Sequence, residues 1–367
     1  MTPFSRRIGV LGAGQLGRML AMAGYPLGHK FGFYGLNHDE PAAMLGQLHT
    51  PSDDVHNLAQ LIEDVDVITY ESENTSVELI KQISETKPVY PGANSLYYSQ
   101  HRGREKGLFT ELNIPCAPYA LVESLAELER AVAQIGLPAI LKTSTEGYDG
   151  KGQFVIKQPE QIKQAWLSIG EREAVLEGFI TFKRELSIIA VRNAHNEHVY
   201  YPLVENQHRD GILRLTLAPA QAIDPQIQHQ AEAYMLALLD RMDHVGVLTL
   251  ELFETDAGLV ANEMAPRVHN SGHWTMEGAE TSQFENHIRA ISGLPLGATA
   301  PRQAFAAMIN IIGEHGDITA ALKLPNVHVH LYDKAERPGR KLGHINVLAD
   351  SQDALNHTLK QLQAWLS

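Results

Sequence analysis

The sequence is poor in several features that would assign a protein quickly to a class. It has one cysteine, Cys116, in 367 residues, which excludes a disulfide within the chain and favours a reducing compartment, so we expect a cytoplasmic protein. No apolar run approaches the roughly 18 residues of a membrane helix, so we expect no membrane contact. Basic residues are also few, since 30 Lys and Arg against 43 Asp and Glu give a net charge of -13. Nucleic acid is therefore not expected as a partner.

Several catalytic signatures are missing as well. The chain has no Gly-x-Ser-x-Gly segment, which disfavours a serine hydrolase of the nucleophile-elbow type. His269 and His273 stand four residues apart, but a glycine breaks the segment between them and no His-Glu-x-x-His helix surrounds them. A zinc site is therefore disfavoured.

The order of apolar segments predicts several domains of the α/β and α+β classes. Short apolar strands alternate with helical patterns over residues 1–98, which is typical of a Rossmann-like lobe with a parallel sheet. We predict a small antiparallel lobe over 99–187, a larger antiparallel α+β lobe over 188–300, and a small C-terminal domain of strands and helices over 301–367.

A glycine turn follows the first predicted strand. Gly12, Gly14 and Gly17 have the spacing of a dinucleotide-binding turn, whose backbone amides and helix dipole favour a phosphate group. An NAD site needs an acidic residue at the end of the second strand, but the first acid there is Asp39, after Tyr34 and four more residues. NAD is therefore disfavoured. A plain structural turn stays possible, and a substrate phosphate is favoured.

A second glycine-rich segment lies between two predicted strands rather than before a helix. It runs from Gly147 to Gly152 and follows Lys142, which stands on the preceding strand. Such a hairpin can close its amides over nucleotide phosphates while the lysine supplies a fixed positive charge. The alternative is a plain hairpin with a long turn.

Two glutamates stand within the apolar strands predicted near 246–254 and 259–264. Glu251 and Glu263 would be costly there unless a divalent cation neutralises them. They lie opposite each other if the connection is the five residues 255–259 or if a strand carries a bulge. The alternative is a pair of carboxylates at a solvent-exposed edge.

The clearest basic cluster spans 333–341 and contains Lys334, Arg337, Arg340 and Lys341. In an acidic protein it is a candidate anion clamp, and a solvated loop is the alternative.

Together these segments resemble the ATP-grasp family, and within it the N5-carboxyaminoimidazole ribonucleotide synthetases of purine biosynthesis. The resemblance runs along nearly the whole chain. Its most specific segments are residues 14–19, 147–153, 210–214, 262–275 and 332–344.

The resemblance implies a role for many residues. It assigns ATP binding to Arg102, Lys142, Gly147, Tyr148, Asp149, Gly150, Lys151, Gly152, Gln153, Glu177, Gly178, Phe179, Ile180, Glu185, His208, Asn262 and Glu263. The register of Arg102 against Arg104 stays open. The catalytic residues would be Tyr148, Asp149, Arg267, His269 and Lys334. The substrate phosphate would lie on Gln15, Leu16, Arg340 and Lys341, and the metal on Glu251 and Glu263.

The resemblance also implies the reaction. ATP, bicarbonate and 5-aminoimidazole ribonucleotide would give N5-carboxyaminoimidazole ribonucleotide, ADP and phosphate, with about two Mg²⁺ ions and a homodimeric enzyme. Three alternatives remain: a formate-using phosphoribosyl transformylase of similar lobes, a Rossmann oxidoreductase, and a nucleotide-binding regulator without activity.

Overall fold

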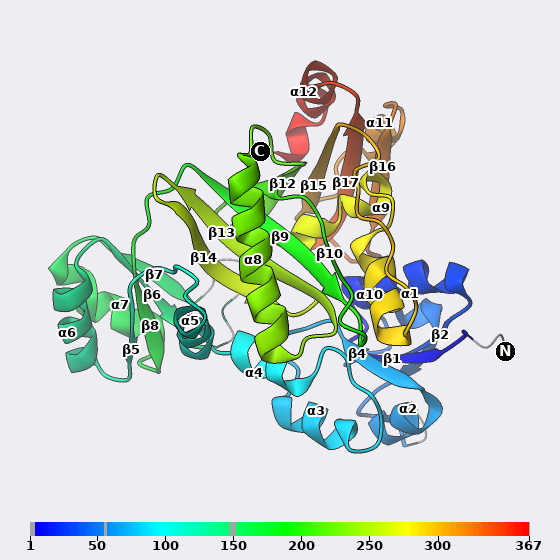
Figure 1. The fold of residues 1–367 in the computed structure, drawn as a ribbon, viewed down its shortest axis with the longest axis horizontal. Coiled ribbons are helices and arrows are strands. Elements are labelled where there is room, and N and C mark those ends of the chain that lie inside the picture. The colour runs from blue at the N-terminus through cyan, green and yellow to red at the C-terminus, as the bar shows by residue number, and fades with distance from the viewer. Residues whose placement is uncertain (1–3, 55–56, 146, 148–151, 367) are drawn as a thin grey trace.

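The computed structural model describes residues 4–54, 57–145, 147 and 152–366. Three sheets organise the chain: a parallel sheet of four strands, an antiparallel sheet of four, and an antiparallel sheet of nine (Figure 1). The mixed α/β class predicted from the sequence is confirmed. Within the described residues, no helix is both long enough and apolar enough to cross a bilayer.

The N-terminal lobe is the parallel sheet, in the order β3-β2-β1-β4. Its strands are β1 Arg7–Leu11, β2 Lys30–Tyr34, β3 Gln47–His49 and β4 Val67–Tyr70, and its helices are α1 Gln15–Gly24, α2 Leu58–Asp64, α3 Val77–Ser84 and α4 Ala93–Ser99. All four residues of β4 are buried, as expected for a parallel strand covered on both faces. The carboxyl ends of β1 and β4 therefore lie side by side, because the two strands pair in parallel.

The small lobe follows helix α5 Arg102–Glu111. Its sheet has the order β5-β8-β6-β7, and its elements are β5 Tyr119–Val122, α6 Leu125–Ile135, β6 Ala139–Thr143, β7 Gln153–Ile156, α7 Ile162–Ser168 and β8 Ala174–Gly178. Helices α6 and α7 pack on one face of this sheet around Leu128, Leu141 and Trp166. Figure 1 shows the lobe standing apart from the other two sheets.

The large sheet has the order β14-β13-β9-β11-β12-β15-β17-β16, with β10 paired to β9. Its strands are β9 Arg184–Arg192, β10 His198–Tyr200, β11 Val204–Arg209, β12 Ile212–Ala218, β13 Gly246–Thr255, β14 Gly258–Ala265, β15 Phe305–Ile312, β16 Val327–Leu331 and β17 Lys341–Ala349. Helix α8 Pro225–Met242 crosses one face over β13 and β9, burying Met235, Leu238 and Leu239 against the sheet (Figure 1). Helices α9 Thr275–Gly278 and α10 Gln283–Ser292 cover the other side, where α10 packs on α1 of the N-terminal lobe.

The C-terminal segment, with helices α11 Ile318–Leu322 and α12 Gln352–Gln361, adds its strands to the large sheet. Strand β15 pairs with β12, so the sheet continues from the residues predicted as the larger lobe into those predicted as a C-terminal domain. Strand β17 was not predicted, and it pairs with both β15 and β16. The large sheet therefore continues across the domain boundary predicted at residue 300. The boundary itself stays a prediction.

The hairpin of β13 and β14 differs from the predicted loop and agrees with the predicted bulge. The strands close through the two-residue turn of Asp256 and Ala257, because Thr255 pairs with Gly258. The pairing then shifts by one residue, so that Glu251 lies opposite Glu263. The extra residue of this bulge is Asn262. With the two-residue turn alone, Glu251 would lie opposite Asn262, and the bulge shifts the pairing so that Glu251 lies opposite Glu263.

Candidate active site

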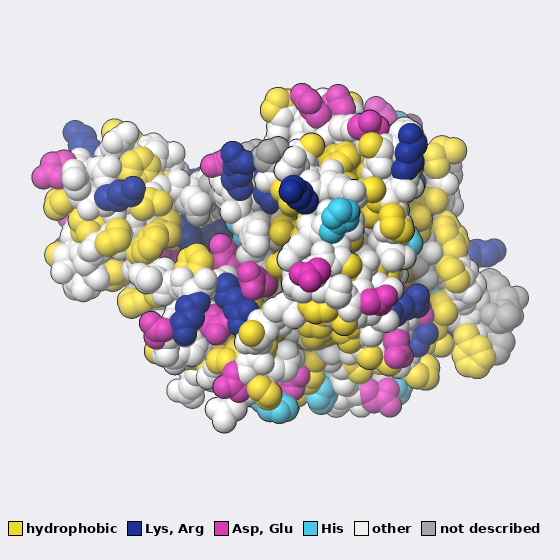
Figure 2. Space-filling view, turned by 90° about the horizontal axis from the view of Figure 1, so that it is seen from above, with side chains coloured by type: hydrophobic (Ala, Val, Ile, Leu, Met, Phe, Trp, Pro, Cys, Tyr) yellow, Lys and Arg dark blue, Asp and Glu magenta, His cyan; other side chains and the backbone are white. Residues whose placement is uncertain are grey.

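A cavity of about 590 Å³ opens where the three lobes meet. Figure 2 shows the small lobe standing away from the rest of the molecule, with acidic and basic side chains gathered where the two parts meet. The cavity wall contains these residues predicted from the sequence: Gln15, Leu16, Arg102, Lys142, Gly147, Gln153, Glu185, His208, Glu251, Asn262, Glu263, Arg267, His269 and Lys341. The predicted residues Gly152, Glu177, Gly178, Phe179, Ile180, Lys334 and Arg340 lie outside this wall. Tyr148, Asp149, Gly150 and Lys151 lie outside the described residues.

Helix α5 holds the bulge that aligns the two glutamates. The Lys106 ammonium donates to the carbonyl oxygen of Asn262 at 2.8 Å, and the amide of Met264 donates to the Glu105 carboxylate at 2.6 Å. Lys106 and Glu105 are 0% and 2% exposed, so both contacts are shielded from water. The cross-strand position of Glu263 is therefore supported by a helix that is distant in sequence.

The two glutamates face each other at close quarters and divide their charge unequally. Burial, and next the neighbouring Glu263, raise the pKa of Glu251 to about 7. Burial also opposes ionisation of Glu263, but the Arg102 guanidinium 3.0 Å away outweighs it and holds the pKa of Glu263 below its ordinary value. Arg102 thus favours the ionised form of Glu263, while Glu251 titrates near neutral pH.

The structure separates Arg102 from Arg104. Arg102 lines the cavity and pairs with Glu263, whereas the guanidinium of Arg104 lies 4.2 Å from the ring centroid of Tyr97. Of these two arginines, Arg102 is the one that lines the cavity, and its role in ATP binding stays a prediction.

A buried group of charges surrounds Lys142, which stands on β6. Lys142 donates to Glu177 at 2.9 Å, and Lys106 approaches the same carboxylate oxygen at 3.5 Å. Burial disfavours the charge of Glu177, yet Lys142, Lys106 and then Arg102 hold its pKa below its ordinary value. Burial lowers the pKa of Lys142, and the two other cations add to this effect. One carboxylate thus serves several cations, which leaves positive charge available for an anionic ligand.

Two contacts shape the opposite wall. The His208 ring lies 2.6 Å from the Glu185 carboxylate, and the rings of Phe182 and Phe253 stack with centroids 4.6 Å apart. Phe179 is 49% exposed and lies away from the cavity wall. Glu185 and His208 therefore join in the cavity, whereas the segment around Phe179 does not reach it here.

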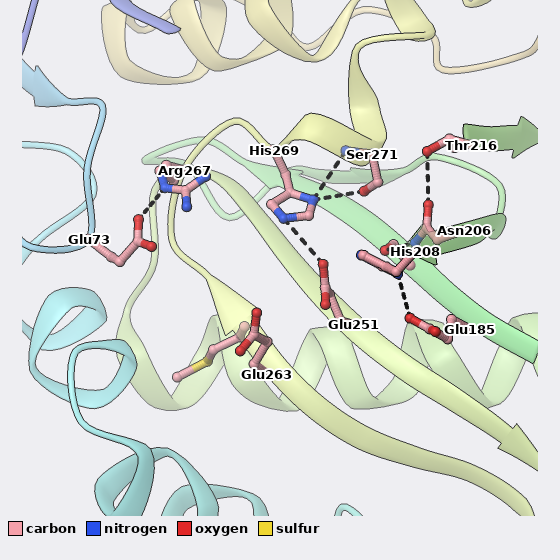
Figure 3. A network of polar contacts seen from close by, with 12 residues as sticks. Glu73, Glu185, Asn206, His208, Thr216, Glu251, Glu263, Arg267, His269 and Ser271 are labelled. Atoms are coloured by element: carbon pink, nitrogen blue, oxygen red, sulfur yellow. Dashed lines mark hydrogen bonds and ion pairs between the residues drawn. The ribbon is translucent and has the colours of Figure 1, made fainter. Parts of the chain in front are cut away.

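Arg267 and His269 come from the loop after β14, and Figure 3 shows Arg267 pointing toward Glu73 and His269 pointing toward Glu251. Arg267 forms an ion pair with Glu73, which comes from the loop after β4. The Nε2 atom of His269 lies 3.3 Å from Glu251, while Nδ1 is 2.8 Å from the Ser271 hydroxyl. Burial lowers the pKa of His269 to about 3, so the ring is neutral at pH 7.

The glycine turn is filled from within the protein. The carboxylate of Glu71, directly after β4, accepts the amides of Gly14 at 2.6 Å and Gly17 at 2.7 Å. These are among the amides that a dinucleotide pyrophosphate would use, so the NAD interpretation is further disfavoured.

The basic segment approaches the turn from the other side. Lys334 donates to the side-chain oxygen of Gln15, and Lys341 lines the cavity. Burial, with Arg340 next, lowers the pKa of Lys334 to about 8. Arg340 instead donates to the carbonyl oxygen of Ala335 at 3.2 Å, within its own loop.

Glu71, Glu73, Glu105 and Lys106 were not predicted as site residues. For the first two, a signal was present: ligands gather at the carboxyl ends of parallel strands, and the segment 71–74 directly follows one. Glu105 and Lys106 carry no such signal, because their role depends on a helix packing against a distant strand. Among the described residues, no group of three or more His, Cys, Asp or Glu is arranged to hold a metal by itself.

Three family models match successive segments of the chain, from the N-terminal lobe to the C-terminal segment. The ribonucleotide synthetase preATP-grasp domain matches residues 5–100, the ATP-grasp domain matches 107–284, and the phosphoribosylaminoimidazole carboxylase C-terminal domain matches 306–358. The N5-carboxyaminoimidazole ribonucleotide synthase of Pseudomonas aeruginosa is 47% identical over 360 residues, which covers 98% of this chain and 99% of that protein.

Solved structures agree. The N5-carboxyaminoimidazole ribonucleotide synthetase of Thermus thermophilus superposes with a TM-score of 0.93 at 47% identity, covering 98% of both chains. The synthase of Aspergillus clavatus, solved with ADP and 5-aminoimidazole ribonucleotide, superposes with a TM-score of 0.89 at 30% identity over 99% of this chain and 98% of that one.

Proposed function

The chain belongs to the ATP-grasp family of N5-carboxyaminoimidazole ribonucleotide synthases, and from this membership we propose the reaction that it catalyses. It is an ATP-dependent carbon–nitrogen ligase of purine biosynthesis. It converts 5-aminoimidazole ribonucleotide, bicarbonate and ATP into N5-carboxyaminoimidazole ribonucleotide, ADP and phosphate.

The observation that carries this proposal is the meeting of three kinds of group in one cavity. Its wall contains the paired glutamates with the cations Arg102 and Lys142, the residues Arg267 and His269, and Gln15 and Leu16 of the glycine turn with Lys341. An enzyme that joins bicarbonate to a phosphorylated amine needs groups for ATP, for a small oxyanion and for a phosphate ester.

Glu251 and Glu263 would hold Mg²⁺, and about two ions are expected. The pair fits a divalent cation because the two carboxylates lie opposite each other in the cavity wall, where their mutual repulsion and the burial of Glu251 disfavour simultaneous charge. Two protein carboxylates would be enough for an ion whose other ligands are nucleotide phosphates and water. When bound, Mg²⁺ supplies neutralisation of the phosphate charge.

ATP phosphates would lie between this pair and Arg102, Lys142 and the hairpin segment 147–153. The hairpin also contains Tyr148, Asp149, Gly150 and Lys151, which we keep as predicted ligands from the family resemblance. Glu185 and His208 would contact the ribose side of the nucleotide, and Glu177 would keep Lys142 in place. The segment around Phe179 lies outside the cavity wall and stays a predicted ATP contact.

Bicarbonate is a poor electrophile, so its phosphorylation by ATP to carboxyphosphate activates it for attack by the amine. Carboxyphosphate hydrolyses readily, which favours a closing hairpin that excludes water. Arg267 and neutral His269 stand where the oxyanion would develop charge, with Lys334, Tyr148 and Asp149 as further predicted catalytic residues. Arg267 is ion-paired with Glu73, so its guanidinium is already oriented.

The ribonucleotide phosphate would lie at Gln15 and Leu16, close to Lys334 and Lys341, with Arg340 at the rim. The cytoplasmic location, the homodimer and the domain boundaries remain proposals. The homodimer proposal is supported by the family resemblance.

The test is the release of ADP, measured with bicarbonate and 5-aminoimidazole ribonucleotide each present or omitted. We expect rapid release only when both are present with Mg²⁺ and ATP, and the product should incorporate labelled bicarbonate. Turnover that depends on formate instead would identify the transformylase alternative. A rate of ADP release that is the same with and without the ribonucleotide would contradict the proposal.

A further inference from the structure

The glycine turn after β1 has an occupant that the reaction scheme does not use. Glu71 sits beneath it, and each of its carboxylate oxygens accepts one amide, from Gly14 and from Gly17. Burial raises the pKa of Glu71, while these two amides act in the opposite direction. The carboxylate thus stands where a bound phosphate stands in a dinucleotide-binding turn.

The glycines of the turn are explained by this carboxylate. A Cβ atom on Gly12 would lie 2.3 Å from Cγ of Glu71, and one on Gly14 would lie 2.7 Å from its Oε1. Gly12 also has a φ of +113°, which other residues rarely adopt. The motif that looks like a nucleotide fingerprint is therefore required here by a side chain of the same protein.

Glu71 leaves part of the turn for a ligand. The amides of Gln15 and Leu16 lie between the two that it holds, both residues line the cavity, and Lys334 contacts the Gln15 side chain. A single phosphate has access to this half of the turn. A second phosphate would need the amides of Gly14 and Gly17, where it would meet the buried carboxylate and be repelled.

We propose that Glu71 is a specificity-determining residue that limits this end of the cavity to one phosphate group. It excludes pyrophosphate esters by occupying two amides, and it positions Gln15 and Leu16 for a phosphate monoester. This inference rests on the proposed function, because that function places the ribonucleotide phosphate at the turn.

The decisive experiment titrates inorganic pyrophosphate by calorimetry into protein already saturated with ADP and Mg²⁺, so that the nucleotide site is filled. Glu71→Ala opens the turn and should bind pyrophosphate at least tenfold more tightly than the unmodified protein. Asp66→Asn is the matched control, since Asp66 also accepts a backbone amide, that of Arg7 at 2.8 Å, at the opposite end of β1 from the glycine turn. This control should behave like the unmodified protein. Equal affinities for Glu71→Ala and the unmodified protein would overturn the proposal.

A second variant covers a folding failure of the first. Glu71→Gln keeps the volume but offers one acceptor to two amides, so the KM for 5-aminoimidazole ribonucleotide should rise about tenfold while the KM for ATP changes less than twofold. Unchanged KM values for both substrates would contradict the positioning role, and so would an equal rise in both. If the unmodified protein itself shows no ribonucleotide-dependent turnover, the proposed function fails, whereas the pyrophosphate titration still tests Glu71.

Discussion

Replacing Glu251 by Gln should stabilise the protein while it abolishes ATP turnover. The buried carboxylate lies opposite Glu263 and is 15% exposed, so its charge is disfavoured when no metal is bound. Gln has nearly the same shape and can still accept a hydrogen bond from the neutral His269 ring. The substitution therefore removes an unfavourable charge without leaving a cavity.

The size of the effect follows from the pKa of Glu251, which is raised from 4.5 to about 7. A raised carboxyl pKa means that the unfolded chain releases this proton more easily, so stability is lost as the pH rises from about 4.5 through about 7. Each pKa unit corresponds to ~1.4 kcal/mol, which gives a ceiling of about 3 kcal/mol at pH 8. In a chain of this length such a gain raises the Tm by roughly 2–6 °C.

Thermal unfolding of both proteins, followed without Mg²⁺ between pH 5 and pH 8, measures the gain. It should be largest at pH 8 and should vanish near pH 5. The turnover of Glu251→Gln should fall by a factor of roughly ten to a hundred or more, as is typical when a group that stabilises transition-state charge is lost. Glu254→Gln, on the same strand, is the control: Glu254 pairs with Arg184 at 2.6 Å, so its loss should give no stabilisation. A lower Tm for Glu251→Gln at pH 8 would refute the argument from buried charge, and retained Mg²⁺-dependent turnover would refute the metal assignment.

Three further predictions follow from other parts of the structure. Fluorescence titration with NADH should show no saturable binding, because Glu71 holds the amides of Gly14 and Gly17; micromolar binding would contradict this. In steady-state assays, Lys341→Ala should raise the KM for the ribonucleotide about tenfold or more and leave the KM for ATP nearly unchanged. Arg340→Ala should raise the KM for the ribonucleotide less, and an equal rise in the KM for both substrates would indicate a folding role. Burial lowers the pKa of His287 to about 3, so the stability that its neutral ring contributes above pH 6.5 is lost as the pH falls toward 3; His287→Gln should flatten the fall in Tm between pH 7 and pH 4, and an unchanged slope would exclude this histidine.

The sequence alone determined the elements whose signals are local. Helix α8 is such an element, because Asp224 caps it and Pro225 occupies its first position. Glu251 and Glu263 were found because a carboxylate within an apolar strand is conspicuous without any knowledge of the fold. The family was recognisable for a related reason, since its motifs are short contiguous segments.

Only the tertiary structure decided how these elements meet. Strand β17 escaped prediction because His344 and Asn346 interrupt its apolar pattern. Their burial is supported by hydrogen bonds to Tyr332, to Glu277 and to the carbonyl oxygen of His273, all distant in sequence. The occupant of the glycine turn was likewise hidden, because Glu71 lies 54 residues or more from the amides that it accepts. Periodicity and capping act over a few residues and can be read along the chain. Charge pairing, burial and the partner of each amide depend on residues that only folding brings together.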